Sequence, residues 1–476
     1  MIDDAPVLSA VEILEATGGT ALRGGTGWSC RGISTDTRTL RAGNLFIALP
    51  GENFDGHDCL AAASAKGAAG LLIRADRFEK LADGTKGVPV IGVPDTLRGL
   101  GAIAHAWRMR FAIPIVAITG SSGKTTTKEM IAAIASRSRN ILKTEGNLNN
   151  LIGLPQTLLR LNEGHDLAIV EMGTNTPGEI ARLAAIAAPD IGLITNIGSA
   201  HLEGLGSIEA VREEKGALFG VMAGRGTALI NADDPHIAVI AERWRGKRVT
   251  FGLTPDVEVT ARGIGTAGAE GVRFTLVIDG IGIPVRMSVC GTHNIRNALA
   301  ATAAAGALGF DRHAIAAGLA AFRPVPGRME IRRLANGAFI IMDAYNANPA
   351  SMREALKTLQ GLKGAGSAIA ILGDMLELGG KAEELHEGVG AILAETRVDR
   401  VFLKGTLSRS TAAGALKEGF PQERVAFFDE PGEVISCLRA QLKKDDWILI
   451  KGSRKMKMEA VAEAVIAAFD VRAETV

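Results

Sequence analysis

Cysteine is scarce in this sequence, and its four cysteines stand far apart at Cys30, Cys59, Cys290 and Cys437. They form no C-x-x-C pair, and no histidine follows them at the spacing of a metal finger. The cysteines therefore do not indicate a structural metal site. We expect buried or unreactive thiols, as in proteins of the reducing cytosol.

The sequence also has no excess of positive or negative charge. The 476 residues include 53 Lys and Arg and 52 Asp and Glu, which gives no support for a nucleic-acid coat or a membrane-surface role. The start, MIDDAPVLSAVEIL, lacks a basic segment followed by an apolar core, and residues 298–310 are too short to span a bilayer. We expect a cytoplasmic monomer that acts on small molecules, with no nucleic-acid partner and no membrane insertion.

The pattern of apolar runs divides the chain into three α/β blocks, and its length suits two to four domains. We expect a small α/β domain over residues 1–94, a central domain with a parallel sheet over 95–322, and a Rossmann-like doubly wound domain over 323–476. The border near residue 322 rests on FRPVPGRME, where prolines and a glycine interrupt the pattern.

Local patterns refine the two larger blocks. In the central block, apolar runs of strand length alternate with helical stretches, and a glycine-punctuated β pattern at 257–289 predicts an antiparallel extension. In the last block, polar residues follow strands directly at Asp343, 373–375 and 451–454. Because ligands bind outside the carboxyl ends of the strands in such sheets, these residues mark a candidate site.

A phosphate-binding loop is predicted where the apolar strand IPIVAIT runs into TGSSGKTT and a helix. The glycines let the backbone approach phosphate, Lys124 reaches the outer phosphates, and the hydroxyl of Thr125 suits Mg²⁺. A full P-loop pattern has glycine where this chain has Ile118, and the shortened form is typical of ATP-dependent amide ligases. The expected ATP-binding residues of the loop are Thr119, Gly120, Ser121, Ser122, Gly123, Lys124, Thr125 and Thr126.

Further motifs occur in all three blocks. They are TEGNLNNLIGLP (144–155), EMGTNTPGEI (171–180), NIGSAHLEGLGS (196–207), GTHNIRNALAA (291–301), DAYNANPASM (343–352), LGDMLELG (372–379) and KGSRKMKME (451–459). Together with the phosphate loop they resemble the Mur ligase family, and the later motifs favour its members that add D-alanyl-D-alanine to UDP-N-acetylmuramoyl-tripeptide in peptidoglycan synthesis. The resemblance implies that ATP phosphorylates the tripeptide carboxylate and that the dipeptide amine then displaces phosphate.

The resemblance also implies Mg²⁺ beside the loop. Glu171 and His201 each follow a strand next to the one that feeds the loop, and the matching family positions bind magnesium. Lys215 matches a lysine that CO₂ converts to a carbamate, which helps to hold a second magnesium ion. The expected metal residues are Thr125, Glu171, His201 and Lys215, and the expected catalytic residues are Lys124, His201 and Lys215. Without the resemblance, these positions would be an ordinary strand-end carboxylate, a loop histidine and a solvated lysine.

Other residues are expected to complete the nucleotide site. By resemblance, Asn297 contacts the adenine, His293 and Asn294 shape the cleft, and Arg328 and Asp343 bind ATP from the third block. Closure of the blocks would then assemble the site. Helix capping is the alternative role for the two asparagines.

Substrate residues are expected in three regions. STDTRTLRAGNLFIALPGENFDGHD matches the family's uridine-nucleotide region, although a polar loop between strands is the alternative. The GNLNN asparagines are expected to position the muramoyl substrate, and the DAYNANP loop is expected to bind substrate. The basic KGSR segment is expected to bind either the dipeptide carboxylate or the substrate. The expected residues are Ser34, Asp36, Arg38, Asn53, Asn147, Asn149, Asn150, Tyr345, Asn346, Asn348, Lys451 and Arg454.

Other functions stay open at this point. Another Mur ligase or a folylpolyglutamate synthase would share the phosphate loop and Lys215 but use a different amine, and DAYNANPASM and LGDMLELG argue against it. A P-loop regulatory module would not need Glu171, His201 and Lys215 together. The sequence also departs from the usual family pattern at Thr174, Thr176 and the Glu213-Glu214 pair. The third residue of the tripeptide, diaminopimelate or lysine, is undetermined.

Overall fold

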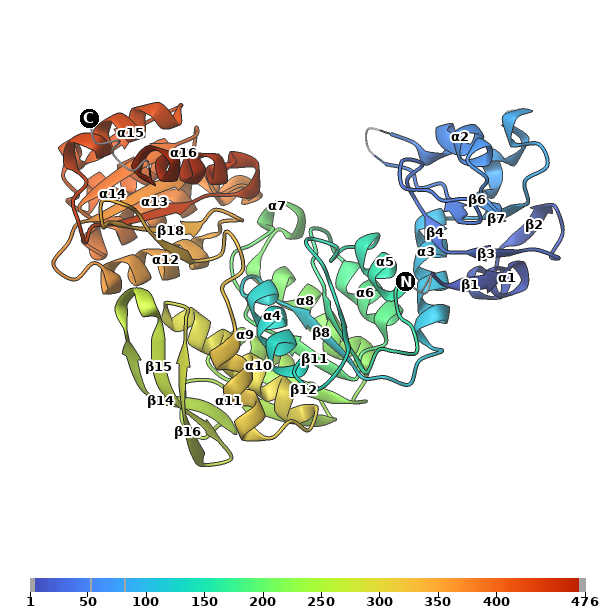
Figure 1. The fold of residues 1–476 in the computed structure, drawn as a ribbon, viewed down its shortest axis with the longest axis horizontal. Coiled ribbons are helices and arrows are strands. Elements are labelled where there is room, and N and C mark those ends of the chain that lie inside the picture. Colours follow the sequence, from blue (N-terminus) through green and yellow to red (C-terminus); the bar gives the residue numbers. More distant parts are fainter. Residues whose placement is uncertain (1–4, 52–53, 81–82, 471–476) are drawn as a thin grey trace.

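The computed structural model describes residues 5–51, 54–80 and 83–470, and it has three lobes in chain order (Figure 1). Each lobe is built on its own mainly parallel sheet with helices packed against it. The predicted three-part α/β fold is therefore confirmed. Within the described residues, no helix combines the length and the apolar character needed to cross a membrane.

The first lobe combines a five-stranded sheet with a two-stranded ribbon. Only β2 runs antiparallel, at the edge of the sheet. In spatial order the sheet contains β2 (Thr20–Arg23), β7 (Val90–Val93), β6 (Gly70–Arg74), β5 (Leu45–Ile47) and β4 (Ile33–Ser34), and the ribbon pairs β1 (Val7–Ser9) with β3 (Ser29–Arg31). The helices are α1 (Ala10–Thr17), α2 (Leu60–Ala65) and α3 (Thr96–Arg108). Helix α3 also packs against the central lobe, so it joins the two.

The central lobe has a nine-stranded sheet that is parallel except for the predicted antiparallel extension at one end. Its inner strands are buried over their whole length, which explains why they read as unbroken apolar runs. In spatial order the strands are β16 (Ile281–Met287), β15 (Val272–Ile278), β14 (Val259–Thr266), β13 (Lys247–Phe251), β12 (Thr227–Asn231), β11 (Ile191–Ile194), β8 (Ile115–Thr119), β10 (Leu167–Glu171) and β9 (Ile141–Lys143).

Helices cover both faces of the central sheet. One apolar core lies under α4 (Lys124–Ala135), α10 (Thr292–Ala307) and α11 (Arg312–Ala321). The other lies under α5 (Gly153–Leu158), α6 (Glu179–Ala187), α8 (Ile208–Met222) and α9 (Pro235–Glu242). The short helix α7 (Leu202–Leu205) reaches toward the C-terminal lobe (Figure 1).

The C-terminal lobe has the predicted doubly wound sheet, with one edge strand, β17, that the sequence pattern did not predict. In spatial order it contains β17 (Glu330–Arg333), β18 (Phe339–Asp343), β22 (Trp447–Lys451), β19 (Ala368–Gly373), β20 (Arg400–Lys404) and β21 (Val425–Phe427). Helices α12 (Pro349–Leu362), α13 (Ala382–Glu395) and α14 (Ser408–Lys417) cover one face, and α15 (Pro431–Gln441) and α16 (Met458–Asp470) cover the other. The predicted domain borders fall between β7 and α3 and between α11 and β17.

Candidate active site

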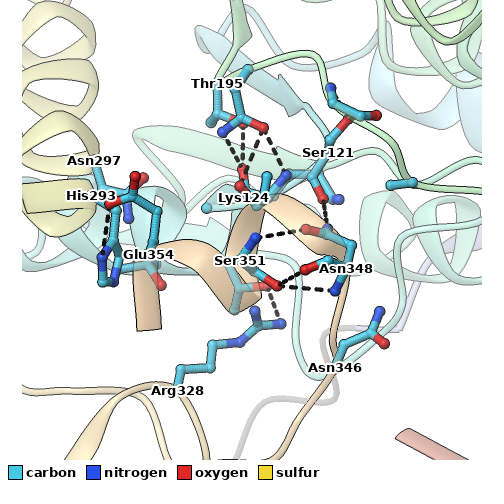
Figure 2. Close-up of a pocket in the computed structure, with 18 of the residues that line it drawn as sticks. Ser121, Lys124, Thr195, His293, Asn297, Arg328, Asn346, Asn348, Ser351 and Glu354 are labelled. Atoms are coloured by element: carbon cyan, nitrogen blue, oxygen red, sulfur yellow. Dashed lines mark hydrogen bonds and ion pairs between the residues drawn. The ribbon is translucent and has the colours of Figure 1, made fainter. Parts of the chain in front are cut away.

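A cavity of about 770 Å³ opens where the carboxyl ends of the central and C-terminal strands face each other. The central lobe contributes the phosphate loop, the asparagine loop after β9 and the start of α10. The C-terminal lobe contributes the loop after β18 and residues that follow β19 and β22. In Figure 2, Ser121 and Lys124 of the phosphate loop lie opposite Asn348 and Ser351 of the C-terminal lobe. Two lobes therefore build one site.

The phosphate loop has the close-packed geometry that its glycines predict. Gly120 has φ +146°, and a Cβ at this position would lie 1.9 Å from Oγ1 of Thr195. Gly123 has φ +79° and precedes α4, and a Cβ there would lie 2.4 Å from Oδ1 of Asn297. The Nζ of Lys124 donates to the carbonyl of Gly120 over 2.7 Å. Burial lowers the pKa of Lys124, so its ammonium lies in a weakly solvated place where it attracts phosphate strongly.

Thr125 and Glu171 provide oxygen atoms beside this loop. The Thr125 hydroxyl donates to Oε2 of Glu171 over 2.8 Å, and Nδ2 of Asn149 donates to Oε1 over 2.9 Å. Hydroxyl and carboxylate oxygens are ligands that Mg²⁺ prefers, so this pair fits the expected ion. No group of three or more His, Cys, Asp or Glu side chains among the described residues is arranged to hold a metal. The remaining ligands would be nucleotide phosphates and water, as is usual for Mg²⁺.

His201 lies at the same cavity but has a partner in the C-terminal lobe. Its Nδ1 is 2.9 Å from Oε2 of Glu377, and the amide of Glu203 donates to the Glu377 carbonyl over 3.2 Å. The hydrogen bond with His201 lowers the pKa of Glu377. The structure thus places His201 in a contact between the central and C-terminal lobes. The oxygen atoms suited to Mg²⁺ lie together instead at Thr125 and Glu171.

Lys215 is buried, contrary to the solvated lysine that its acidic neighbours indicate. The side chain on α8 is 1% exposed, and it forms no salt bridge with any residue in the described ranges. Burial, helped by the charge of Lys124, lowers the pKa of Lys215 to about 7. A substantial fraction of this amine is therefore neutral near pH 7, and a neutral amine is a nucleophile.

The Glu213-Glu214 pair divides into one exposed and one buried carboxylate. Glu213 pairs with Arg243 and Arg212 at the surface. Glu214 accepts from the amides of Gly178 over 2.6 Å and Ile180 over 2.8 Å. It also accepts from the hydroxyl of Thr174 over 3.2 Å. Two positions where the sequence departs from the usual family pattern, Thr174 and Glu214, are therefore direct partners.

The expected adenine residues meet at the start of α10. Nδ2 of Asn297 donates to Oδ1 of Asn294 over 3.2 Å, and Asn294 in turn donates to the carbonyl of Cys290 over 2.8 Å. Neither asparagine caps the helix, since its N-cap is Gly291 without a side-chain bond. Next to them, the buried Nδ1 of His293 has no hydrogen-bond partner among the described residues and lies 3.9 Å from Oε2 of Glu354 (Figure 2). An orphaned polar atom beside a cavity is available to a ligand.

Arg328 connects the C-terminal lobe to the phosphate loop. Its Nη2 donates to Oγ1 of Thr125 over 2.9 Å, and Nδ2 of Asn348 donates to the carbonyl of Ser121 over 3.3 Å. The ring of Tyr345 lies between two arginines, with Cζ of Arg328 at 4.0 Å and Cζ of Arg454 at 5.4 Å from its centroid. These cation–π contacts place the only tyrosine in the cavity wall rather than in a core.

The two basic residues of the KGSR segment differ in environment. Lys451 is 2% exposed, and its Nζ contacts Oδ2 of Asp343 at 2.5 Å and the carbonyl of Asn346 at 3.0 Å. Arg454 has a side chain that is 65% exposed, lines the cavity and lies 3.7 Å from Glu459. The ammonium group of Lys451 is therefore paired inside the protein with Asp343, and the guanidinium group of Arg454 is accessible to solvent.

Comparison with known proteins identifies the family. Models of three Mur ligase domains match consecutive segments: the Mur ligase family catalytic domain at residues 29–108, the Mur ligase middle domain at 118–305 and the Mur ligase glutamate ligase domain at 327–454. The UDP-N-acetylmuramoyl-tripeptide–D-alanyl-D-alanine ligase of Bacillus subtilis is 37% identical over 91% of this chain and 93% of its own length. The chain belongs to the Mur ligase family. The resemblance inferred from the motifs is confirmed, and the protein is an ATP-dependent ligase.

Other proteins similar to this Mur ligase carry the same name or have a similar fold. The Escherichia coli ligase of the same name is 38% identical over 91% of the chain and 93% of its own length. A crystal structure of MurF from Acinetobacter baumannii superposes with a TM-score of 0.89 at 30% identity, covering 98% of this chain and 100% of that one. The MurF ligase of Thermotoga maritima, solved with ADP, has a TM-score of 0.82 at 28% identity over 93% and 98% of the two chains.

A second cavity of about 930 Å³ lies at the junction of the first and central lobes of this Mur ligase. Ser34 and Asp36 line it, but Arg38 does not. The Arg38 guanidinium is exposed and pairs with Asp36, whose pKa it lowers to about 2. Gln156 of α5 donates to the hydroxyl of Thr35 over 3.1 Å and ties the lobes together. Asn53 lies outside the described residues.

The asparagine loop divides between the cavity and the helix that follows. Asn147 and Asn149 line the first cavity. Oδ1 of Asn150 instead accepts from the amide of Gly153 over 2.8 Å at the start of α5, which is a structural role. Sequence analysis missed Asn196, whose Oδ1 accepts from the amide of Ser122 over 3.0 Å. Its place in NIGSAHLEGLGS, directly after β11, was the available signal.

Proposed function

We propose that this Mur ligase joins D-alanyl-D-alanine to UDP-N-acetylmuramoyl-tripeptide and so completes the pentapeptide precursor of peptidoglycan. Relatives that carry this name match more than nine tenths of the chain. The observation that carries the proposal is the 2.9 Å contact between Arg328 and Thr125, because it brings a C-terminal lobe of ligase type onto the phosphate loop. A nucleotide switch would not need a site completed by a separate acceptor lobe.

The residues of the cavity account for the first chemical step. ATP lies along the phosphate loop, where Lys124 and the N-terminus of α4 stabilise the negative charge that develops as the γ-phosphoryl group moves. The terminal carboxylate of the tripeptide attacks the γ-phosphorus, the bond to the β-phosphate oxygen breaks, and ADP leaves. Asn147 and Asn149 orient this substrate from one side, and Arg328 from the other.

The second step uses the wall formed by the C-terminal lobe. The dipeptide amine attacks the acyl carbon, a tetrahedral intermediate forms, its C–O bond to phosphate breaks, and the nitrogen releases a proton as the amide forms. The carboxylate of the dipeptide pairs with Arg454, the accessible cation of that wall. His293, Asn294 and Asn297 surround the adenine, Asp343 holds Lys451 and the nearby loop, and the first lobe with Ser34 and Asp36 holds the uridine nucleotide.

Mg²⁺ and a carbamate belong to the same proposal. Thr125 and Glu171 would hold Mg²⁺, which would supply positive charge to neutralise the phosphates. The neutral amine of Lys215 attacks CO₂, forms a C–N bond and releases a proton, which leaves a buried carbamate anion that interacts with the charge of Lys124. The low pKa of this amine, about 7, supports the reaction. We also propose that the enzyme works as a monomer in the cytoplasm.

Phosphate release from ATP tests the proposal. Purified protein is incubated with UDP-N-acetylmuramoyl-tripeptide and D-alanyl-D-alanine, a single D-alanine, or no amine, and the products are identified by mass spectrometry. We expect phosphate and pentapeptide in equal amounts with the dipeptide only, and neither product with Lys124→Ala. Turnover without an amine, or efficient use of a single amino acid, would refute the assigned substrate.

A further inference from the structure

A buried lysine outside the predicted site lies one helical turn after Lys124. Lys128 on α4 is 1% exposed, and its Nζ donates to the carbonyl of Thr144 over 2.5 Å. Oε1 of Glu129 lies 3.1 Å from the same nitrogen, while Oε2 of Glu129 pairs with Lys143. Burial of an ammonium group is costly unless it is paired and hydrogen-bonded. The cation is therefore held at one place, the start of the asparagine loop.

Thr144 links Lys128 to Glu171 through hydrogen bonds. The Thr144 side chain is fully buried, and its hydroxyl accepts from the backbone amide of Glu171 over 2.9 Å. The amide of Thr144 donates to the carbonyl of Ile169 over 3.1 Å. Three hydrogen bonds, made by its amide, carbonyl and hydroxyl, thus hold Thr144 between α4 and β10.

The side chain of Glu171 extends to the oxygen atoms that are expected to bind Mg²⁺. Glu171 accepts from Asn149 through Oε1 and from Thr125 through Oε2. The carbonyl of Asn149 accepts from the amide of Gly173 over 2.7 Å. Lys128 therefore holds the first residue of a loop whose later residue, Asn149, orients the Glu171 carboxylate, and it also holds the backbone of Glu171 through Thr144.

We propose that Lys128 is a positioning residue, which acts through Thr144 to fix the Glu171 carboxylate and the asparagine loop for Mg²⁺ and the acyl substrate. The inference rests on the proposed function, because it takes Glu171 as a magnesium ligand. Partners that orient a metal ligand typically change metal affinity or activity by about 10- to 100-fold when they are removed. Lys128 occupies such a place without touching the ligand.

Lys128→Met tests the inference, with Lys143→Met as its matched control. Methionine keeps an unbranched stem in the core, and the Lys143 side chain shares the Glu129 partner but makes no hydrogen bond to Thr144. The affinity for ADP is measured by calorimetry over a range of Mg²⁺ concentrations. For Lys128→Met we expect the Mg²⁺ concentration at half-maximal effect to rise about tenfold or more, and for Lys143→Met to change less than about twofold.

A second readout separates positioning from simple stability. Hydrogen exchange of the peptide that contains residues 144–150 should become faster in folded Lys128→Met, and kcat should fall while KM for ATP at saturating Mg²⁺ is retained. Unchanged Mg²⁺ dependence and exchange in the folded variant would overturn the inference. If Lys128→Met does not fold, Thr144→Val decides by the same titration, because it removes only the acceptor for the Glu171 amide. The titration contains no dipeptide, so failure of wild-type protein to make pentapeptide would refute the proposed function and leave this test intact.

Discussion

The side-chain nitrogen of Lys451 lies 2.5 Å from Oδ2 of Asp343, and the two residues are aligned partners on the parallel strands β22 and β18. This pair is almost fully buried on the lysine side. A buried ion pair of this kind holds a local geometry, and removal of one partner leaves an uncompensated charge. Lys451 therefore shapes the loop that carries Asn346 and Tyr345, whereas Arg454, whose side chain is 65% exposed, is accessible to a substrate.

Arg454→Met should raise KM for D-alanyl-D-alanine and leave KM for ATP unchanged, because a charged hydrogen bond to a carboxylate is lost. A loss of about 1.5–3 kcal/mol corresponds to roughly 10- to 100-fold in kcat/KM. The measurement is steady-state kinetics with each substrate varied in turn.

Lys451→Met serves as the comparison for Arg454→Met. It should lower the free energy of unfolding by about 3–5 kcal/mol, since the mostly buried carboxylate of Asp343 loses its partner. Urea unfolding measures this change. A selective rise in KM for the dipeptide in a fully stable Lys451→Met protein would reverse the two assignments.

Activity should depend on CO₂ and pH through Lys215. Because burial lowers the pKa of Lys215 to about 7, the amine is protonated below pH 7 and cannot form a carbamate, and it becomes reactive above that pH. Rates in CO₂-depleted buffer should fall about tenfold or more and recover with bicarbonate, most completely above pH 7. Lys215→Ala should be inactive in bicarbonate and partly restored by high concentrations of a small carboxylate.

The same shift predicts how stability changes with pH. Lysine in the unfolded chain titrates near its model value of 10.5, and Lys215 in the folded protein near 7. Between these values the unfolded state binds more protons, so this group makes the free energy of unfolding rise with pH over that window. Lys215→Met should remove that contribution, and a pH profile of urea midpoints that is identical in the variant would contradict the shift.

The sequence pattern predicted the strands best where they are buried on both faces. All five residues of β8 and of β10 are buried, so each strand appears as an apolar run. By contrast, β17 reads EIRR and is partly or fully exposed along its length, which hides it from a search for apolar periodicity. Edge strands of this kind are defined by their neighbour, here β18, and not by their own composition.

The site was predictable where its residues are contiguous. The phosphate loop needs only one strand, one turn and one helix, so a short motif specifies it. The pairing of Lys451 with Asp343 and the capping by Glu214 join segments that are far apart in the chain. Composition indicated a solvated Lys215 because two glutamates precede it, but helix periodicity turns Glu214 and Lys215 inward and Glu213 outward.

Gly120→Ala should abolish nucleotide binding in a folded protein. The added Cβ would lie 1.9 Å from Oγ1 of Thr195, and the residue has φ +146°, so the phosphate loop must change shape. Gly220→Ala is the control, since Gly220 is an exposed residue of α8 with nothing within 4 Å of the new Cβ. This control should stabilise the protein by about 0.5–1 kcal/mol. ADP affinity by calorimetry and the thermal midpoint measure both effects, and tight ADP binding by Gly120→Ala would contradict the loop geometry.

Glu214→Ala should destabilise the protein far more than Glu213→Ala, although the two residues are neighbours on α8. Glu214 accepts from the amides of Gly178 and Ile180 and from Thr174, and the N-cap of α6 has no side-chain bond of its own. Truncation leaves the buried amide of Ile180 unpaired at about 1–3 kcal/mol and removes the bonds from Gly178 and Thr174 at about 1 kcal/mol each, so a loss of about 3–5 kcal/mol is expected.

Glu213 is half exposed and pairs only with surface arginines, so its removal should change the free energy of unfolding by less than about 1 kcal/mol. Urea unfolding of both variants measures the difference. Glu214→Gln should lie between them, because an amide oxygen still accepts but its NH₂ group faces a second donor. Equal losses for the two alanine variants would mean that the capping bonds do not stabilise the loop after Glu171. If the capping bonds do stabilise this loop, Glu214 holds the EMGTNTPGEI segment against α8. The positions of Glu171 in that segment and of Lys215 on α8, both expected at the magnesium site, then depend on Glu214.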